Sequence, residues 1–275
     1  MMLTAPPLAL PLVACVAIGA FAPLIGTFLV QKRLSLIGDG IGHVAFAGVG
    51  AGLLLNVWPV WTALAFAVIG AVGVETLRMR RKASGDLALA LFFYTGLALG
   101  AVFASHAGDL DVETLPYLFG DPYTASTVGV AVIVAMGLVV ASWILLLRRV
   151  LFAVVSDEEW ARVAGLPVDT VNIVLAGVTA AVVVVGMKVV GILLIAALTV
   201  LPVASAQLLG RSFGHTLRLA CAIGAASAAA GMLTGRAVDV APGGAIVIVA
   251  AAIFTVVALT KRAAPRSLVM AEAEP

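Results

Sequence analysis

Nine long apolar stretches, separated by charge clusters or by glycine and proline, run along the chain. Each is close to the roughly 20 apolar residues that an α-helix needs to cross the hydrocarbon core of a bilayer. Only Gly186, Met187 and Lys188 separate the sixth stretch from the seventh, so a broken or re-entrant helix there would leave eight spans. The predicted spans are residues 8–30, 37–57, 59–77, 87–105, 124–147, 169–187, 189–208, 214–234 and 243–260.

The pattern therefore predicts an all-α integral membrane protein, a polytopic bundle of 8–9 transmembrane helices. Composition agrees, because hydrophobic residues make up 63% of the chain and charged residues only 11%, against roughly 25% charged in soluble domains. Aromatic residues are few, and the abundant small residues favour closely packed helices over an alternating outer-membrane barrel. Cys15 and Cys221 lie in apolar runs without a CxxC partner, so neither a disulfide nor a thiolate metal site is expected.

The basic residues predict the orientation of the chain. Cytoplasmic loops of membrane proteins are enriched in Lys and Arg. If the segment after the first span is cytoplasmic and the spans alternate, fourteen of the sixteen basic residues fall on the cytoplasmic side. Only Lys188 and Arg236 fall on the other. The N-terminus is then predicted outside and the C-terminus inside, and the outer segment 106–122 carries four acidic residues and no basic one.

No soluble domain is expected within the sequence. Residues 1–265 are predicted to form a single transmembrane domain, and residues 266–275 a disordered cytoplasmic tail. No Gly-Lys dipeptide occurs, which excludes a phosphate-binding P-loop, so any energy source must lie in another protein. The spans contain no Ser/His/Asp or GxSxG arrangement, which argues against an intramembrane hydrolase.

Asp39 and His43 open the second span at positions i and i+4, so both side chains project from one helix face. Ionisable residues within a span are costly and often mark an ion path. A carboxylate with an imidazole suits a first-row divalent cation such as Zn²⁺ or Mn²⁺. The alternative is a structural Asp–His hydrogen bond, with Asp39 capping the helix. The nearby glycines are predicted to serve helix packing.

The long cytoplasmic loop at residues 156–167 is predicted to hold a short helix. Ser156 and Glu159 have capping-box spacing, and Gly165 is placed to end the helix. So short a helix needs a surface to dock on. That surface could be the chain's own loops, lipid headgroups or a partner protein. The residues expected to face it are Trp160, Val163 and Ala164.

Three polar or helix-bending positions elsewhere have simpler expected roles. Pro202 lies within a predicted span and is expected to bend its axis. Glu75 stands one turn before Arg78, which predicts an ion pair. Asn172 is expected to bond a backbone carbonyl near the start of its span.

Four segments resemble the permease subunits of the zinc/manganese/iron ABC importer family, in that family's order and spacing. They are residues 35–43 (SLIGDGIGH), 117–120 (YLFG), 161–168 (ARVAGLPV) and 189–206 (VVGILLIAALTVLPVASA). The resemblance implies that Asp39 and His43 are ligands on a metal path. It also implies that the loop helix is the coupling helix that inserts into an ATPase subunit. One departure is that Gly40 and Gly42 flank Ile41, where bulkier residues or Ala and Ser are common.

The function implied is that of a membrane-spanning subunit of an ABC importer in the bacterial inner (plasma) membrane. Its transported substrate would be a divalent transition metal, zinc or manganese, with iron a third option, and no cofactor would be bound permanently. The implied partners are a second copy of the chain, cytoplasmic ATPase subunits, an extracytoplasmic metal-binding protein and membrane lipid, without nucleic acid. The alternatives are a secondary cation transporter driven by an ion gradient and a non-transporting membrane enzyme or scaffold.

Overall fold

The computed structural model describes residues 8–80, 85–107, 115–210 and 212–263, and these ranges are almost entirely helical. The helices are α1 (Ala9–Gln31), α2 (Ile37–Leu54), α3 (Pro59–Met79), α4 (Gly85–Ala107), α5 (Leu115–Phe119), η1 (Pro122–Thr124), α6 (Thr127–Ser156), α7 (Glu158–Val163), α8 (Val168–Val190), α9 (Ile192–Leu209), α10 (Phe213–Val238) and α11 (Pro242–Ala263). The predicted tail at residues 266–275 lies outside the described residues.

Each of the nine predicted spans corresponds to one helix. Within the described ranges, eight helices are long and apolar enough to cross a membrane, and α9 is a shorter apolar helix. The break between the sixth and seventh spans is a single residue, Gly191, whose φ of +90° suits glycine. The predicted break at residues 186–188 was therefore placed too early, because α8 continues through Lys188 to Val190.

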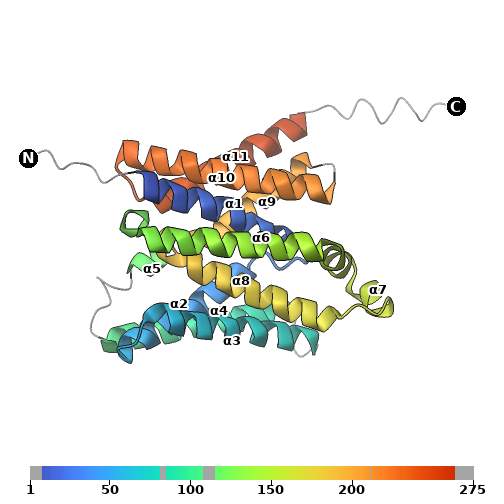
Figure 1. The fold of residues 1–275 in the computed structure, drawn as a ribbon, viewed down its shortest axis with the longest axis horizontal. Coiled ribbons are helices and arrows are strands. Elements are labelled where there is room, and N and C mark those ends of the chain that lie inside the picture. The colour runs from blue at the N-terminus through green and yellow to red at the C-terminus, as the bar shows by residue number, and fades with distance from the viewer. Residues whose placement is uncertain (1–7, 81–84, 108–114, 211, 264–275) are drawn as a thin grey trace, which may run out of the picture.

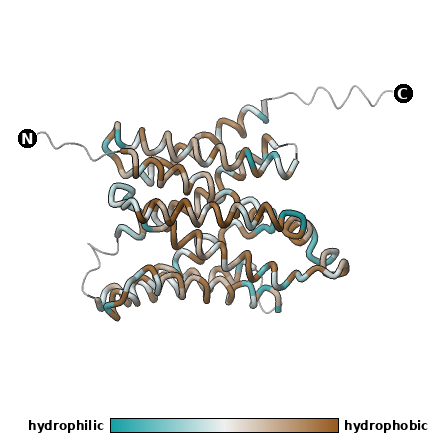
Figure 2. Tube along the Cα trace, viewed as in Figure 1, coloured by the Kyte–Doolittle hydropathy of each residue, from teal (hydrophilic) through white to brown (hydrophobic). Residues whose placement is uncertain are grey.

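The helices form two groups with α6 and α8 between them (Figure 1). One group contains α1, α9, α10 and α11, and the other contains α2, α3 and α4. Hydrophobic residues dominate the middle of the long helices and hydrophilic residues gather at their ends (Figure 2). α7 lies at one end of the bundle and α5 at the other (Figure 1). With 30 residues, α6 is longer than predicted and exceeds what a membrane core requires.

Glycines let the helices of the second group pack backbone to backbone, as their spacing predicts. A Cβ on Gly48 would lie 2.6 Å from the Ala63 Cα of α3. A Cβ on Gly96 of α4 would lie 2.8 Å from the carbonyl carbon of His43. α2 is thus enclosed by its neighbours, and most of its residues are buried. Pro202 lies inside α9, which continues through it.

Two of the family-like segments meet at the end of the bundle away from α7. Gly120 ends the YLFG segment with φ +76°, and Gly191 separates α8 from α9. A Cβ on Gly191 would lie 2.4 Å from the carbonyl carbon of Phe119. The two turns therefore pack directly together, although the sequence separates them by about seventy residues, and a side chain on either glycine would push them apart.

Candidate functional site

Asp39 and His43 lie on one face of α2, as the i and i+4 spacing predicts, with His43 Nε2 3.6 Å from Asp39 Oδ1. This distance exceeds the roughly 2.7–3.2 Å of an N–H···O hydrogen bond. The Asp39 side chain also does not cap α2, which begins without a side-chain cap. The expected alternative, a structural Asp–His hydrogen bond with Asp39 as cap, is therefore wrong for this conformation.

The imidazole of His43 is buried without a hydrogen bond. Its side chain is 5% exposed, and neither ring nitrogen has a partner among the described residues. The closest aromatic neighbour is Phe93 of α4, whose ring centroid lies 4.4 Å from that of His43 in an edge-to-face arrangement. Leaving a buried polar group unpaired costs about 1–3 kcal/mol, so a group that paired with this imidazole would recover that free energy.

A pocket of about 270 Å³ lies beside this pair, between α2 and the first turns of α4. Its acidic lining consists of Asp39 and Asp86, and its remaining lining is mostly apolar. Sequence reasoning missed Asp86, which starts α4 more than forty residues after Asp39. No group of three or more His, Cys, Asp or Glu side chains that could hold a metal ion occurs in the described part of the chain. A metal ion held by Asp39 and His43 would have two ligands from this chain, and water or another chain would have to complete its coordination shell.

The predicted loop helix exists as α7, but Ser156 does not cap it. Ser156 is the last residue of α6, and Asp157 caps α7 by accepting a hydrogen bond from the Trp160 backbone N–H at 2.9 Å. The Ser156–Glu159 capping box is therefore wrong, because α6 extends too far for Ser156 to be a cap. Gly165 ends α7 as predicted, with φ +79° and with the Leu166 N–H bonded to the Ala161 carbonyl.

α7 has one face toward the bundle and one face toward solvent. Ala161 is fully buried against Val154 and Val168. On the opposite face, Trp160 is 62% exposed and Val163 is 89% exposed, and Glu159 and Ala164 are exposed as well. The apolar face predicted for docking is thus not covered by the described parts of the chain.

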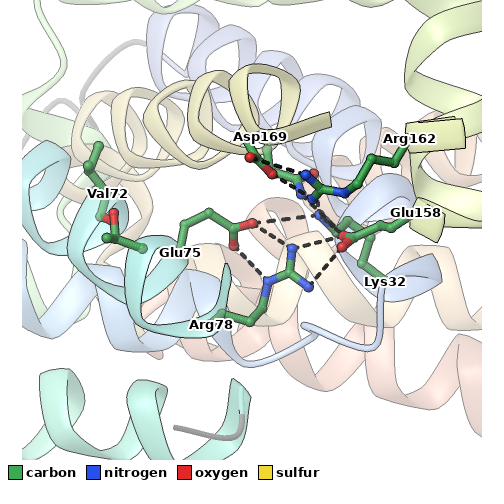
Figure 3. Close-up of polar contacts among 9 residues, drawn as sticks. Lys32, Val72, Glu75, Arg78, Glu158, Arg162 and Asp169 are labelled. Atoms are coloured by element: carbon green, nitrogen blue, oxygen red, sulfur yellow. Dashed lines mark hydrogen bonds and ion pairs between the residues drawn. The ribbon is translucent and has the colours of Figure 1, made fainter. Parts of the chain in front are cut away.

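A partly buried ionic network connects α7 to the bundle (Figure 3). Arg78 donates to Glu75 at 2.6 and 3.0 Å, which confirms the predicted ion pair. Lys32, 4% exposed at the end of α1, lies 2.9 Å from Glu158 of α7 and 3.9 Å from Glu75. Asn172 accepts from Lys32 at 2.5 Å and donates to Glu158 at 3.2 Å, so its predicted bond to a backbone carbonyl is wrong.

Sequence reasoning missed the roles of Lys32 and Glu158, whose pKa values reflect this setting. Burial lowers the pKa of Lys32, while Glu75 and Glu158 act to raise it. Burial alone would raise the pKa of Glu158, but hydrogen bonds from Arg78 and Lys32 outweigh it and hold the pKa below its usual value. The ion pairs of Glu158 are therefore present at neutral pH and are lost as the pH falls through this lowered pKa.

Comparison with known proteins gives the chain its family. Residues 7–261 match the model of the ABC 3 transport family. The chain belongs to this family. Two relatives are the manganese transport system membrane protein MntC of Halalkalibacterium halodurans, 30% identical over 88% of this chain and 83% of its own length, and the high-affinity zinc uptake system membrane protein ZnuB of Haemophilus influenzae, 29% identical over 88% of this chain and 92% of its own.

A solved structure shows the same fold. PsaBC from Streptococcus pneumoniae, determined in complex with a Fab, superposes with a TM-score of 0.82 at 26% identity, covering 91% of this chain and 90% of that chain. The predicted resemblance is thus confirmed. The chain is a multi-pass inner-membrane permease subunit of an ABC transporter, and ATP hydrolysis belongs to a separate subunit.

Proposed function

We propose that this permease imports a divalent transition metal, manganese or zinc, and that Asp39 and His43 contact the ion as it passes. The observation that carries the proposal is the buried imidazole of His43, unpartnered and 3.6 Å from a carboxylate. Neutral imidazole and carboxylate are ligands that these metals accept. The relatives named for manganese and zinc transport support the substrate class. Neither of these two relatives is named for iron transport.

The partners follow from the same features. Two ligands per chain suit a homodimer in which the second copy or water completes the coordination shell, and loose coordination lets the ion leave again. The exposed Trp160 and Val163 suit docking of α7 in a cytoplasmic ATPase subunit. An extracytoplasmic metal-binding protein would deliver the ion to the opposite end. A gradient-driven carrier is not favoured, since the family is that of ABC transporters.

Metal uptake by liposomes tests the function. The chain is reconstituted with its ATPase subunits, and entry of Mn²⁺ and of Zn²⁺ is measured with ATP on the ATPase side. We expect uptake of one of these ions that requires ATP and stops when a non-hydrolysable analogue replaces it. Uptake without ATP that follows a proton or sodium gradient would instead establish the secondary carrier.

Cysteine labelling tests the proposed orientation, which follows from the basic residues. Thr124 in η1 and Val163 in α7 are both exposed and lie near opposite ends of the bundle. A single cysteine at Val163 should react with an impermeant reagent only from the cytoplasmic side, and one at Thr124 only from outside. Labelling of both from one side would overturn the orientation.

A further inference from the structure

α7 contacts the rest of the chain through one buried apolar residue, the carboxylate of Glu158 and an exposed ion pair between Arg162 and Asp169 of α8. The apolar contact is Ala161, which packs in a small cluster with Val154 of α6 and Val168 of α8. These two helices flank α7 in the sequence, so this contact is local. The carboxylate of Glu158 instead reaches α3 and the end of α1, which are remote in the sequence.

Glu158 joins three helices through one side chain. It accepts from Arg78 of α3 at 2.8 Å, from Lys32 at 2.9 Å and from Asn172 of α8 at 3.2 Å. Charge-assisted hydrogen bonds are typically short and directional. Of the two that Arg78 donates to Glu158, one is short at 2.8 Å and the other is long at 3.4 Å, so the shorter bond is the main contact between α3 and α7. If α7 moves as a rigid body, the hydrogen bonds of Glu158 must either break or pull the helices that carry its donors along with it.

The two cations that pair with Glu158 are themselves fixed to the bundle. This favours movement of the helices over breakage of the hydrogen bonds. Arg78 is held to Glu75, one turn earlier on α3, by two hydrogen bonds, and Glu75 is 2% exposed. Lys32 follows α1 in a tight helix-ending turn in which Arg33 has φ +60° and the Leu34 N–H bonds the Leu29 carbonyl. Displacement of Glu158 is thus transmitted to backbone, not absorbed by flexible side chains.

From α3 the contacts continue directly to the candidate metal site on α2. Gly70 of α3 lies against Val44, where a Cβ on the glycine would be 2.8 Å from Val44 Cγ1. Val44 follows His43 in the chain. Further along, Gly48 of α2 lies against the backbone of Ala63. Helices packed this closely are expected to move together. α3 therefore provides a physical connection between α7 and His43.

We propose that Glu158 and Arg78 form the link that carries movement of α7 through α3 to Asp39 and His43, so that ATP hydrolysis in the partner is converted into metal release. This inference rests on the proposed function, because it assigns α7 to the ATPase. Glu158 and Arg78 act as positioning residues: neither touches the metal. The Lys32–Glu75 pair supports them and is not itself the link.

The balanced charges of the network permit a matched test. The double variant Lys32→Met/Glu158→Met removes one cation and one anion and leaves Arg78 paired with Glu75, so α7 loses its ionic link to α3. The double variant Lys32→Met/Glu75→Met also removes one cation and one anion, but it leaves Arg78 paired with Glu158. The two variants share the Lys32 change and the net charge, and they differ in whether α3 and α7 remain connected.

Metal import and ATP hydrolysis are measured together in liposomes holding the complete complex, with Mn²⁺ or Zn²⁺, whichever the wild type imports. For Lys32→Met/Glu158→Met we expect normal ATPase binding, continued hydrolysis and about tenfold less metal imported per ATP, within the range usual for coupling between two sites. For Lys32→Met/Glu75→Met we expect a ratio within about twofold of wild type. Equal ratios in the two variants would overturn the link.

A conservative variant covers the case in which a double variant does not assemble. Glu158→Gln keeps an acceptor for Arg78 and loses the charge, so it should assemble and lower the metal-to-ATP ratio by a smaller factor. A wild-type ratio in Glu158→Gln would count against the link. Failure of the proposed function looks different, because the wild-type complex itself would then show no ATP-dependent import.

Discussion

Two polar sites within the described part of this protein, each partly buried, are built in opposite ways. At Asp39 and His43 the imidazole is enclosed and makes no hydrogen bond within the described chain. At the ionic network of Lys32, Glu75, Arg78 and Glu158, two cations and two anions satisfy one another (Figure 3). An unsatisfied buried group lowers the stability of the folded protein, and pairing with a ligand removes that cost. In a satisfied network, loss of any one partner is destabilising. The first arrangement suits transient binding, and the second suits holding helices together.

The largest effect should be on uptake when the unsatisfied site is altered. We expect Asp39→Asn and His43→Ala each to reduce ATP-driven metal uptake by about 100-fold or more, the equivalent of roughly 2.7 kcal/mol. Assembly with the ATPase and basal ATP hydrolysis should be retained, because neither side chain makes a hydrogen bond with another described residue. Liposome uptake and hydrolysis assays on each variant measure both quantities.

His106→Ala is the control for those variants. His106 is exposed at the end of α4, where its ring bonds the Val102 carbonyl of its own helix, so its loss should leave uptake unchanged. Full uptake by a well-folded Asp39→Ala/His43→Ala double variant would show that the pair does not contact the metal.

The second effect concerns the stability of the folded protein. Mutation should lower it at the ionic network and leave it unchanged or raise it at His43. Lys32→Met leaves the buried carboxylate of Glu75 and the partly buried carboxylate of Glu158 with one cation. This change should destabilise the folded protein by about 3 kcal/mol, the lower end of the cost of breaking a fully buried pair. His43→Leu removes an unsatisfied group of similar size and should leave the unfolding temperature unchanged or raised. Thermal unfolding of the purified protein in detergent compares the two variants directly.

Charge balance offers a check on this interpretation. Adding Glu75→Met to Lys32→Met restores one anion per cation and should recover most of the lost stability, because the effects of neighbouring charges are not additive. If the double variant is less stable than Lys32→Met alone, or if His43→Leu is the more damaging change, the contrast between the two sites is wrong.

A smaller effect is expected on the outer face of α7. Trp160→Asp places a charge on the exposed apolar face and should weaken capture of the ATPase by about tenfold, equivalent to roughly 1.4 kcal/mol. The fold should be unaffected, because Trp160 is 62% exposed. Trp58→Asp is the matched control: Trp58 is 69% exposed at the start of α3, away from α7, in the N-cap position that favours Asp. Equal loss of capture in both variants would argue against docking at α7.

The fold could be predicted from the sequence because its main signals are local. Runs of about twenty apolar residues define the spans, and the i, i+4 spacing is enough to place Asp39 and His43 on one face. The errors arose where two local signals compete. Ser156 and Asp157 are both good N-caps, and the choice depends on where α6 ends. Gly186 and Gly191 both lie near the α8–α9 break, and only the positive φ of Gly191 identifies it as the break.

The network could be predicted only in its local part. Glu75 and Arg78 stand at i and i+3, so their pairing could be predicted from the sequence. Lys32 and Asn172 are 140 positions apart, and nothing local relates them. Their meeting depends on how α1, α3 and α8 pack together. For the same reason the lack of a partner for His43 is invisible in the sequence, because it is a property of everything that surrounds the ring.

The smallest effect is expected at the exposed counterpart of the network. Arg162 of α7 and Asp169 of α8 pair at 2.7 Å, but their side chains are 58% and 55% exposed. Water and salt screen such a pair, so its contribution to stability is slight. Asp169→Asn should therefore leave both the unfolding temperature and the metal imported per ATP unchanged. Asp169→Asn breaks an ion pair between α7 and the bundle, as a change at Glu158 does. The two pairs differ in two respects: the Arg162–Asp169 pair is more exposed, and it joins α7 to α8 and not to α3. If Asp169→Asn uncouples transport as strongly as Lys32→Met/Glu158→Met, then any attachment of α7 would suffice, and the buried link to α3 would have no special role.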